Sequence, residues 1–125
     1  MERVFILLGA AFAFIGVGAG AFGAHALSDY FKQYPNLEGT FDTAVRYHLL
    51  HAIALIGIAW ASSRYPGSLT MWSGYLIAIG IVIFSGSLYL LVITRTSWLG
   101  AITPIGGVAF LAGWACLFLA ALRAG

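Results

Sequence analysis

Four long stretches of this chain contain no charged residue, and each is long enough to form a helix that crosses a membrane. Asp, Glu, Lys and Arg are absent from residues 4–28, 47–63, 65–94 and 96–122. A transmembrane helix needs about 20 predominantly apolar residues, because it rises about 1.5 Å per residue across the hydrocarbon core. The pattern predicts four membrane spans, near residues 4–25, 43–62, 71–93 and 103–122.

The overall composition leaves no room for an additional soluble domain. Of the 125 residues, 62% are hydrophobic and only 8% are charged, whereas about 25% of an average soluble domain is charged. A surface so poor in charge must face lipid over most of its area. Six basic and four acidic residues give a net charge of +2, so the chain lacks the clustered basic surface that binds nucleic acid.

The predicted fold class is all-α, with residues 1–125 forming a single four-span domain. Strands of a membrane β-barrel alternate polar and apolar residues in segments of about ten, and runs such as IAIGIVIF (77–84) do not alternate. Short connections favour an integral membrane four-helix bundle with up-down-up-down topology and both termini on one side. In the first connection, Leu27, Tyr30, Phe31 and Tyr34 recur at helical spacing, which predicts a short amphipathic helix in the interfacial headgroup layer.

Basic residues give the predicted orientation. The side that carries the termini has Arg3, Arg64 and Arg123, and the opposite side has Lys32, Arg46 and Arg95. We discount Arg46 because it lies at the start of the second span, and Arg95 because it can fold back onto the bundle. The remaining excess predicts that both termini of this multi-pass protein lie in the cytoplasm, with the spans in the plasma or inner membrane.

Small residues form a stripe on the first span and another on the fourth. The first stripe is Gly9, Ala13, Gly16, Gly20 and Gly23, and the second is Gly106, Ala109, Gly113, Cys116 and Ala120. Small residues let helix backbones approach closely in lipid. Such faces can pack within one chain or between chains, so we expect a homo-oligomer or a subunit of a larger membrane complex, with the lipid bilayer as its main partner.

Polar residues from all four spans converge in one half of the predicted bundle, because the ends of odd spans and the starts of even spans share one side. The candidate binding residues are His25, Arg46, Tyr47, His48, His51, Ser85, Ser87, Tyr89 and Thr103. His51 lies eight residues into the predicted second span, about 12 Å from its start and short of the bilayer midplane. Tyr47 and His51 are four residues apart and stack on one helix face.

This polar cluster has three possible roles. The first is structural, in which the side chains form hydrogen bonds between helices. The second is a metal or haem site that uses His25 and His51, with His48 as a further imidazole. The third is a pocket for a small solute or a proton, including transport, since histidine titrates near neutral pH.

No pattern in the chain predicts an enzyme. Ser85 and Ser87 flank a glycine, but the segment is not the strand-to-helix elbow of a serine hydrolase, and no nucleophile–base pair is evident. We therefore predict a non-enzymatic membrane protein that acts as an accessory or scaffold subunit, or that binds a small ligand. No cofactor is predicted, apart from the metal or haem of the alternative.

The polar groups also lie within four motifs that resemble those of a known family. The motifs are GAFGAH (20–25), YHLLHA (47–52), FSGSLY (84–89) and TPIGGVAFLAGW (103–114). Together they are similar to the small membrane proteins catalogued as domain of unknown function 423, which include bacterial inner-membrane proteins of uncharacterised protein family 0382. The resemblance implies a four-span inner-membrane protein and supplies no activity. Bacterial members often have glutamine where His48 stands, so the resemblance favours His25 and His51.

Overall fold

A computed structural model describes residues 1–124, and the regular structure within that range is entirely helical. Four helical segments are long and apolar enough to cross a membrane, as the charge-free windows predict. They are α1 (Glu2–His25), α3 (Pro35–Arg64), the continuous run of α4 (Ser68–Gly80), η1 (Ile81–Ser85) and α5 (Gly86–Thr94), and α6 (Thr103–Ala124) preceded by the 3₁₀ turn η2 (Ser97–Ala101). The predicted all-α class is confirmed.

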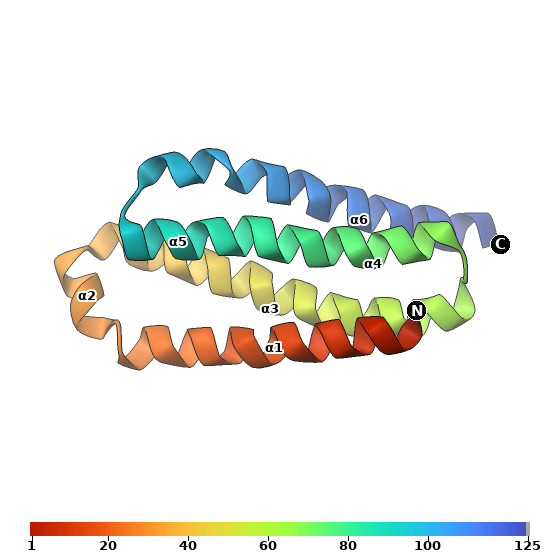
Figure 1. Ribbon diagram of the computed structural model, residues 1–125, viewed down its shortest axis with the longest axis horizontal. Helices are drawn as coiled ribbons and strands as arrows, with labels where there is room; N and C mark the ends of the chain where they lie inside the picture. The colour runs from red at the N-terminus through yellow and green to blue at the C-terminus, as the bar shows by residue number, and fades with distance from the viewer. Residues whose placement is uncertain (125) are drawn as a thin grey trace.

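The four long segments lie side by side, and consecutive segments run in opposite directions (Figure 1). Both ends of the described chain lie at the same end of the bundle (Figure 1). α1 packs mainly against α3, and α6 packs mainly against α4. Only 17% of the apolar window is buried in the first and last segments, against 44% in α3 and 39% in the third segment. The two middle segments therefore form the core, while α1 and α6 present most of their surface to the surroundings.

α3 begins earlier than the sequence pattern predicts, and this changes the position of the candidate site along the helix. Its first residue is Pro35 rather than residue 43. Proline is favourable at this position because the first helical residue has no intrahelical partner for an N–H group. His51 lies sixteen residues after the start of α3 and thirteen before its end, about 24 Å along the axis from Pro35. His51 therefore lies near the middle of the helix, while its depth in the bilayer stays a prediction.

The short helix predicted between the first two spans is present as α2 (Ser28–Gln33). Its apolar side chains pack onto the protein: Phe31 is buried in a cluster with Leu37, Phe41 and Val92. The Tyr30 hydroxyl donates a 2.6 Å hydrogen bond to the carbonyl of Val92 in α5. α2 is thus fixed to the end of the bundle opposite the termini.

The glycines of α1 and α6 are used for helix packing within this chain. A Cβ atom at Gly9 would lie 2.9 Å from the Ala52 carbonyl oxygen of α3, and one at Gly113 would lie 3.1 Å from the Ser73 carbonyl oxygen of α4. A Cβ at Gly106 would overlap the backbone of Phe84. These close approaches explain the stripes without a second chain, so the homo-oligomer stays a prediction.

The third segment contains one turn of π-helix at its centre. Residues Ile81–Ser85 form η1, and such turns insert an extra residue into an α-helix and occur frequently at functional sites. Ser85 is turned toward α3, where its hydroxyl donates a 2.8 Å hydrogen bond to the Ala44 carbonyl. Phe84 is directed toward α6, against the backbone of Gly106. Two consecutive side chains of the π turn thus contact two different helices.

Candidate functional site

The predicted polar residues separate into different environments. His51 and Tyr47 lie on the side of α3 that faces α6, and His48 forms a hydrogen bond with Tyr89 of α5. Ser85 bonds to α3, and the hydroxyls of Ser87 and Thr103 lie 2.6 Å apart, which joins α5 to the start of α6. His25 and Arg46 are exposed and take no part in these contacts.

Both ring nitrogens of His51 are occupied. Nδ1 lies 2.8 Å from the Tyr47 carbonyl oxygen, and Trp114 Nε1 donates a 3.1 Å hydrogen bond to Nε2. An indole N–H only donates, so Nε2 accepts and Nδ1 carries the proton. The ring also stacks on Phe110, with centroids 3.7 Å apart and planes 11° apart. His51 is thus a neutral imidazole held by three contacts, with no lone pair left for a metal.

His48 lies one turn earlier on α3 and is not fully satisfied. Its side chain is only 3% exposed, and Nδ1 lies 2.8 Å from the Tyr89 hydroxyl. Nε2 is buried and forms no hydrogen bond of regular geometry among residues 1–124, although the backbone of Phe12 in α1 lies within reach of the ring. The ring packs edge-on to Phe12, beside the space left by Gly16. The two histidines thus differ, because the nitrogen that forms no hydrogen bond belongs to His48 and not to His51.

The predicted metal pair is not brought together. His25 is exposed at the end of α1, where Gly23 packs against Phe41 of α3. Phe41 precedes His51 by ten residues, about 15 Å along the helix axis. Within the described part of the chain, no group of three or more His, Cys, Asp or Glu residues could hold a metal ion.

Arg46 belongs to a separate hollow between α1 and α3. This hollow has a volume of about 300 Å³, and Glu38 and Asp42 also line it. The two carboxylate residues share this wall of α3 with Arg46 at intervals of four residues. Arg46 therefore does not contribute its charge to the side chains around His51.

A groove of about 580 Å³ lies beside His51, between α3, η1 and α6. Its aromatic walls are Tyr47, His51, Phe84, Phe110 and Trp114, and the remaining lining residues are Leu50, Pro104, Gly107, Val108 and Leu111. Ligand pockets typically have volumes of about 300–1,000 Å³ and are mostly apolar with a few polar groups. The groove has the size and composition of a site for a lipid-soluble molecule.

Tyr47 supplies the free polar atom of this groove. Its side chain is 38% exposed, and its ring packs on Phe84 with centroids 4.7 Å apart. The hydroxyl forms no hydrogen bond to any residue that the structure describes, unlike the hydroxyls of Tyr30, Tyr34 and Tyr89. Tyr47 was predicted as a site residue. Trp114 was not predicted, although its indole lies about two turns after Gly107 on the same helix and could have drawn attention to it.

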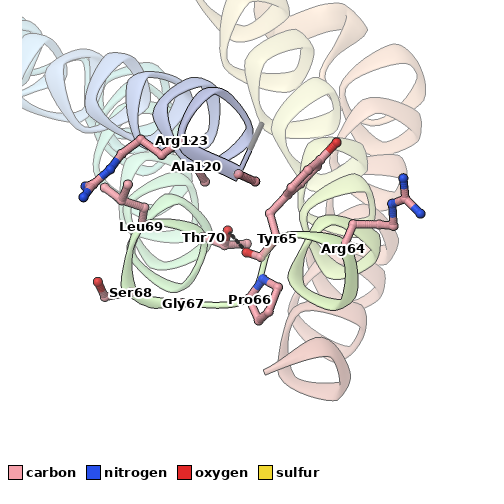
Figure 2. A pocket seen from close by; sticks show the side chains of 10 residues that line it. Arg64, Tyr65, Pro66, Gly67, Ser68, Leu69, Thr70, Ala120 and Arg123 are labelled. Carbon is pink, nitrogen blue, oxygen red and sulfur yellow. Dashed lines mark hydrogen bonds between the residues drawn. The ribbon is translucent and has the colours of Figure 1, made fainter.

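Another hollow, of about 400 Å³, lies at the end of the bundle that carries the termini. Figure 2 shows that the Arg64 and Arg123 side chains at its rim point in opposite directions. The turn itself is closed by a hydrogen bond from the Thr70 hydroxyl to the Tyr65 carbonyl, and Gly67 adopts a φ of +138°. The two positive charges do not converge, so this hollow is a weaker candidate for a binding site than the groove.

Comparisons with known proteins give a consistent picture. The model of a family described as "Protein of unknown function (DUF423)" matches residues 19–107. The UPF0382 membrane protein YwdK of Bacillus subtilis is 46% identical over 123 residues, which cover 97% of this chain and 98% of the relative. The UPF0382 inner membrane protein YgdD of Escherichia coli K12 is 40% identical, with coverage of 98% and 92%. No solved structure matches the chain.

Proposed function

The chain belongs to the DUF423 family of membrane proteins, for which no activity is established, and from its geometry we propose that it is a non-enzymatic protein that binds a lipid-soluble ligand. The site is the groove between α3, η1 and α6, beside Tyr47 and His51. The apolar part of the ligand lies against the aromatic walls, and an acceptor atom of the ligand receives a hydrogen bond from the Tyr47 hydroxyl.

The observation that carries this proposal is the unpartnered hydroxyl of Tyr47 on an apolar groove. Tyr47 lies twelve residues after the start of α3 and four before His51, and we place it within the hydrocarbon layer as part of the proposal. A hydroxyl without a partner in an apolar medium costs roughly 2–7 kcal/mol, depending on the reference state. A ligand with a carbonyl or ether oxygen would remove that cost, whereas a plain hydrocarbon chain would not.

The walls of the groove are rigid enough to favour one binding geometry. Trp114 and Phe110 of α6 are tied to α3 through His51, and η1 holds Phe84 against Gly106. Because both nitrogens of His51 are already used, His51 serves as a wall of the site rather than as an acid, a base or a metal ligand. This supports a binding function over the metal or haem alternative.

We also propose an orientation of the protein in the membrane. We place both termini in the cytoplasm, because Arg3, Arg64 and Arg123 are exposed at that end, while Arg95 at the other end donates a hydrogen bond to Tyr34. Single cysteines at Ser68 and Gly39, introduced in a Cys116→Ser background, would test this. Labelling of Gly39→Cys from the outside supports the orientation, and labelling of Ser68→Cys from the outside overturns it.

The groove is tested by filling it. A Cβ at Gly107 would have only Phe84 Cδ2 nearby, at 3.9 Å, so Gly107→Leu should enter the groove without displacing the backbone. The matched control is Gly18→Leu, because no described atom lies within 4 Å of a Cβ at Gly18. Native mass spectrometry in mild detergent with added dioleoylglycerol measures binding, since this lipid has acyl chains and ester carbonyls but no charge.

We expect one dioleoylglycerol per chain for the wild type and for Gly18→Leu, and at least roughly tenfold weaker binding for Gly107→Leu. A tenfold change corresponds to about 1.4 kcal/mol, which is modest for the loss of several apolar contacts. Equal binding by all three proteins would show that the lipid associates elsewhere and would overturn the proposed function.

A further inference from the structure

We propose that the ligand is a glycerophospholipid, with its phosphate group at Arg95 and one acyl chain in the groove beside His51. This inference rests on the proposed function and adds the class of ligand. It comes from a second, polar hollow at the end of the bundle opposite the termini, and from the position of that hollow relative to the groove.

Arg95 is a cation that the structure holds in place but does not neutralise. Its backbone has a φ of +56°, the one positive φ of a non-glycine residue among residues 1–124. Its guanidinium lies over the ring of Tyr34, 4.6 Å from the centroid, and donates a hydrogen bond to the Tyr34 hydroxyl. Within the described range, no carboxylate forms an ion pair with it. A guanidinium has five N–H donors, so most of them remain available.

The hollow beside Arg95 offers further groups that suit a phosphate. It has a volume of about 260 Å³, and Asn36, Thr40 and Ser97 line it together with Arg95. These side chains carry an amide and two hydroxyls, which donate hydrogen bonds to anionic oxygens as the arginine does. Trp98, next to Ser97, is 65% exposed, as expected for a ring in the membrane interface, where tryptophan is enriched. The hollow therefore fits the headgroup layer.

The polar hollow and the apolar groove follow one face of α3. Asn36 and Thr40 line the hollow, and Tyr47 lines the groove. Tyr47 is eleven and seven residues from them, close to three and two full turns of 3.6 residues each, so all three lie on the same side of the helix. Thr40 and Tyr47 are about 10 Å apart along the axis. The third segment repeats this spacing, with Leu91 at the hollow and Phe84 at the groove.

The order of chemical groups along this face matches the order of groups in a glycerophospholipid. Arg95 meets the anionic phosphate, the Tyr47 hydroxyl meets an ester carbonyl, and the aromatic groove receives an acyl chain. Diacylglycerol lacks the first of these groups. Inorganic phosphate lacks the other two, and a prenyl phosphate lacks the ester carbonyl. These differences allow each part of the inference to be tested separately.

The experiment is native mass spectrometry of the purified full chain with dioleoyl phosphatidylglycerol, dioleoylglycerol and inorganic phosphate. We expect the wild type to bind the phospholipid at least about tenfold more tightly than dioleoylglycerol, the size expected for charge-assisted hydrogen bonds. Arg95→Gln should abolish this preference and leave dioleoylglycerol binding unchanged. Arg95→Lys should retain part of the preference. Arg46→Gln is the matched control, because Arg46 lines another hollow. This variant should retain the full preference for the phospholipid over dioleoylglycerol.

The outcomes separate this inference from the proposed function. If Arg95→Gln binds the phospholipid as tightly as the wild type, the inference fails while the groove stands. If Gly107→Leu weakens dioleoylglycerol binding but not phospholipid binding, the headgroup site is not continuous with the groove, and the inference also fails. If inorganic phosphate at millimolar concentration displaces the phospholipid completely, the site is one for free phosphate. If Arg95→Gln does not fold, two variants that keep a positive charge at residue 95 replace it, Arg95→Lys and Tyr34→Phe. Both must retain a preference for the phospholipid over dioleoylglycerol, and loss of that preference in either variant overturns the inference.

Discussion

His48 and His51 lie one turn apart on the same helix and are equally buried, at 3% exposure each, yet their surroundings differ. His51 contacts α6, and both of its ring nitrogens form hydrogen bonds. His48 contacts α1 and α5, and one of its nitrogens has no partner among the described residues. The two imidazoles therefore belong to two different interfaces of the bundle.

The difference follows from the position of α3. Residues three apart on a helix differ by about 60° around its axis, because each residue turns it by about 100°. That offset matters little on a helix with one packed face. α3 packs against α1 on one side and against the third segment on another, and it contacts α6 through His51. Because α3 has these several neighbours, an angle of about 60° is enough for the two rings to contact different helices. A pair of histidines at this spacing in a central helix is thus no evidence for a shared site.

The strongest test of the comparison is His51→Ala. The substitution leaves the Trp114 N–H and the Tyr47 carbonyl without their partner and opens a cavity against Phe110. We expect a loss of about 3 kcal/mol in the free energy of unfolding, similar to other large buried rings replaced by alanine. Dioleoylglycerol binding should weaken as well. Reversible unfolding in mixed micelles measures the first effect, and a loss below about 1 kcal/mol would contradict the tight packing of this region.

Gly16→Ala tests the region around His48. The new Cβ would lie 2.6 Å from Leu49 Cδ2 and 3.3 Å from His48 Cδ2, so both side chains must move. Overpacking of this kind costs about 1–3 kcal/mol, and we expect about 2 kcal/mol here. The control is Gly18→Ala, which has open space and should change the unfolding free energy by less than about 0.5 kcal/mol. If both substitutions have the same effect, α1 does not pack on α3 through Gly16.

Trp114→Phe removes a single hydrogen bond from the His51 region. The ring remains in the groove, but His51 Nε2 loses its donor. Interhelical hydrogen bonds in membranes contribute about 0.6 kcal/mol on average and about 1.7 at most, so we expect a loss of about 1 kcal/mol. Trp72→Phe, at an exposed tryptophan of α4, should cost nothing measurable. A double-mutant cycle with His51→Gln would show whether the loss belongs to this pair.

Much of the fold could be predicted from the sequence because charge and hydropathy act over whole helices. Four charge-free windows predict four spans, and all four are found as long apolar helices. The start of α3 was missed because residues 35–42 include Glu38 and Asp42 and resemble a connection. Leu37 and Phe41 of this stretch are nevertheless buried against α2, and Pro35 begins the helix.

The candidate site was less predictable because it depends on which helices are neighbours. Hydropathy gives no information on whether α3 contacts α6, and so the bond between His51 and Trp114 could not be predicted. One wall of the groove is Phe84 of η1, and no residue pattern in IVIFS specifies a π turn there. Arg95 was expected to fold back onto the bundle. The structure adds that its target is Tyr34, across 61 residues of chain.

The smallest expected effect is that of His48→Gln, and it bears most directly on the comparison. A glutamine amide can accept a hydrogen bond from Tyr89 through its oxygen, and its NH2 group takes the place of the buried Nε2. Because one hydrogen bond is kept and one buried nitrogen replaces another, the unfolding free energy should change by less than about 0.5 kcal/mol. A loss larger than that of Trp114→Phe would mean that His48 Nε2 has a partner in the membrane, such as a bound water or a ligand atom. His48 would then join the site from the α1 side, and the separation of the two histidines would no longer hold.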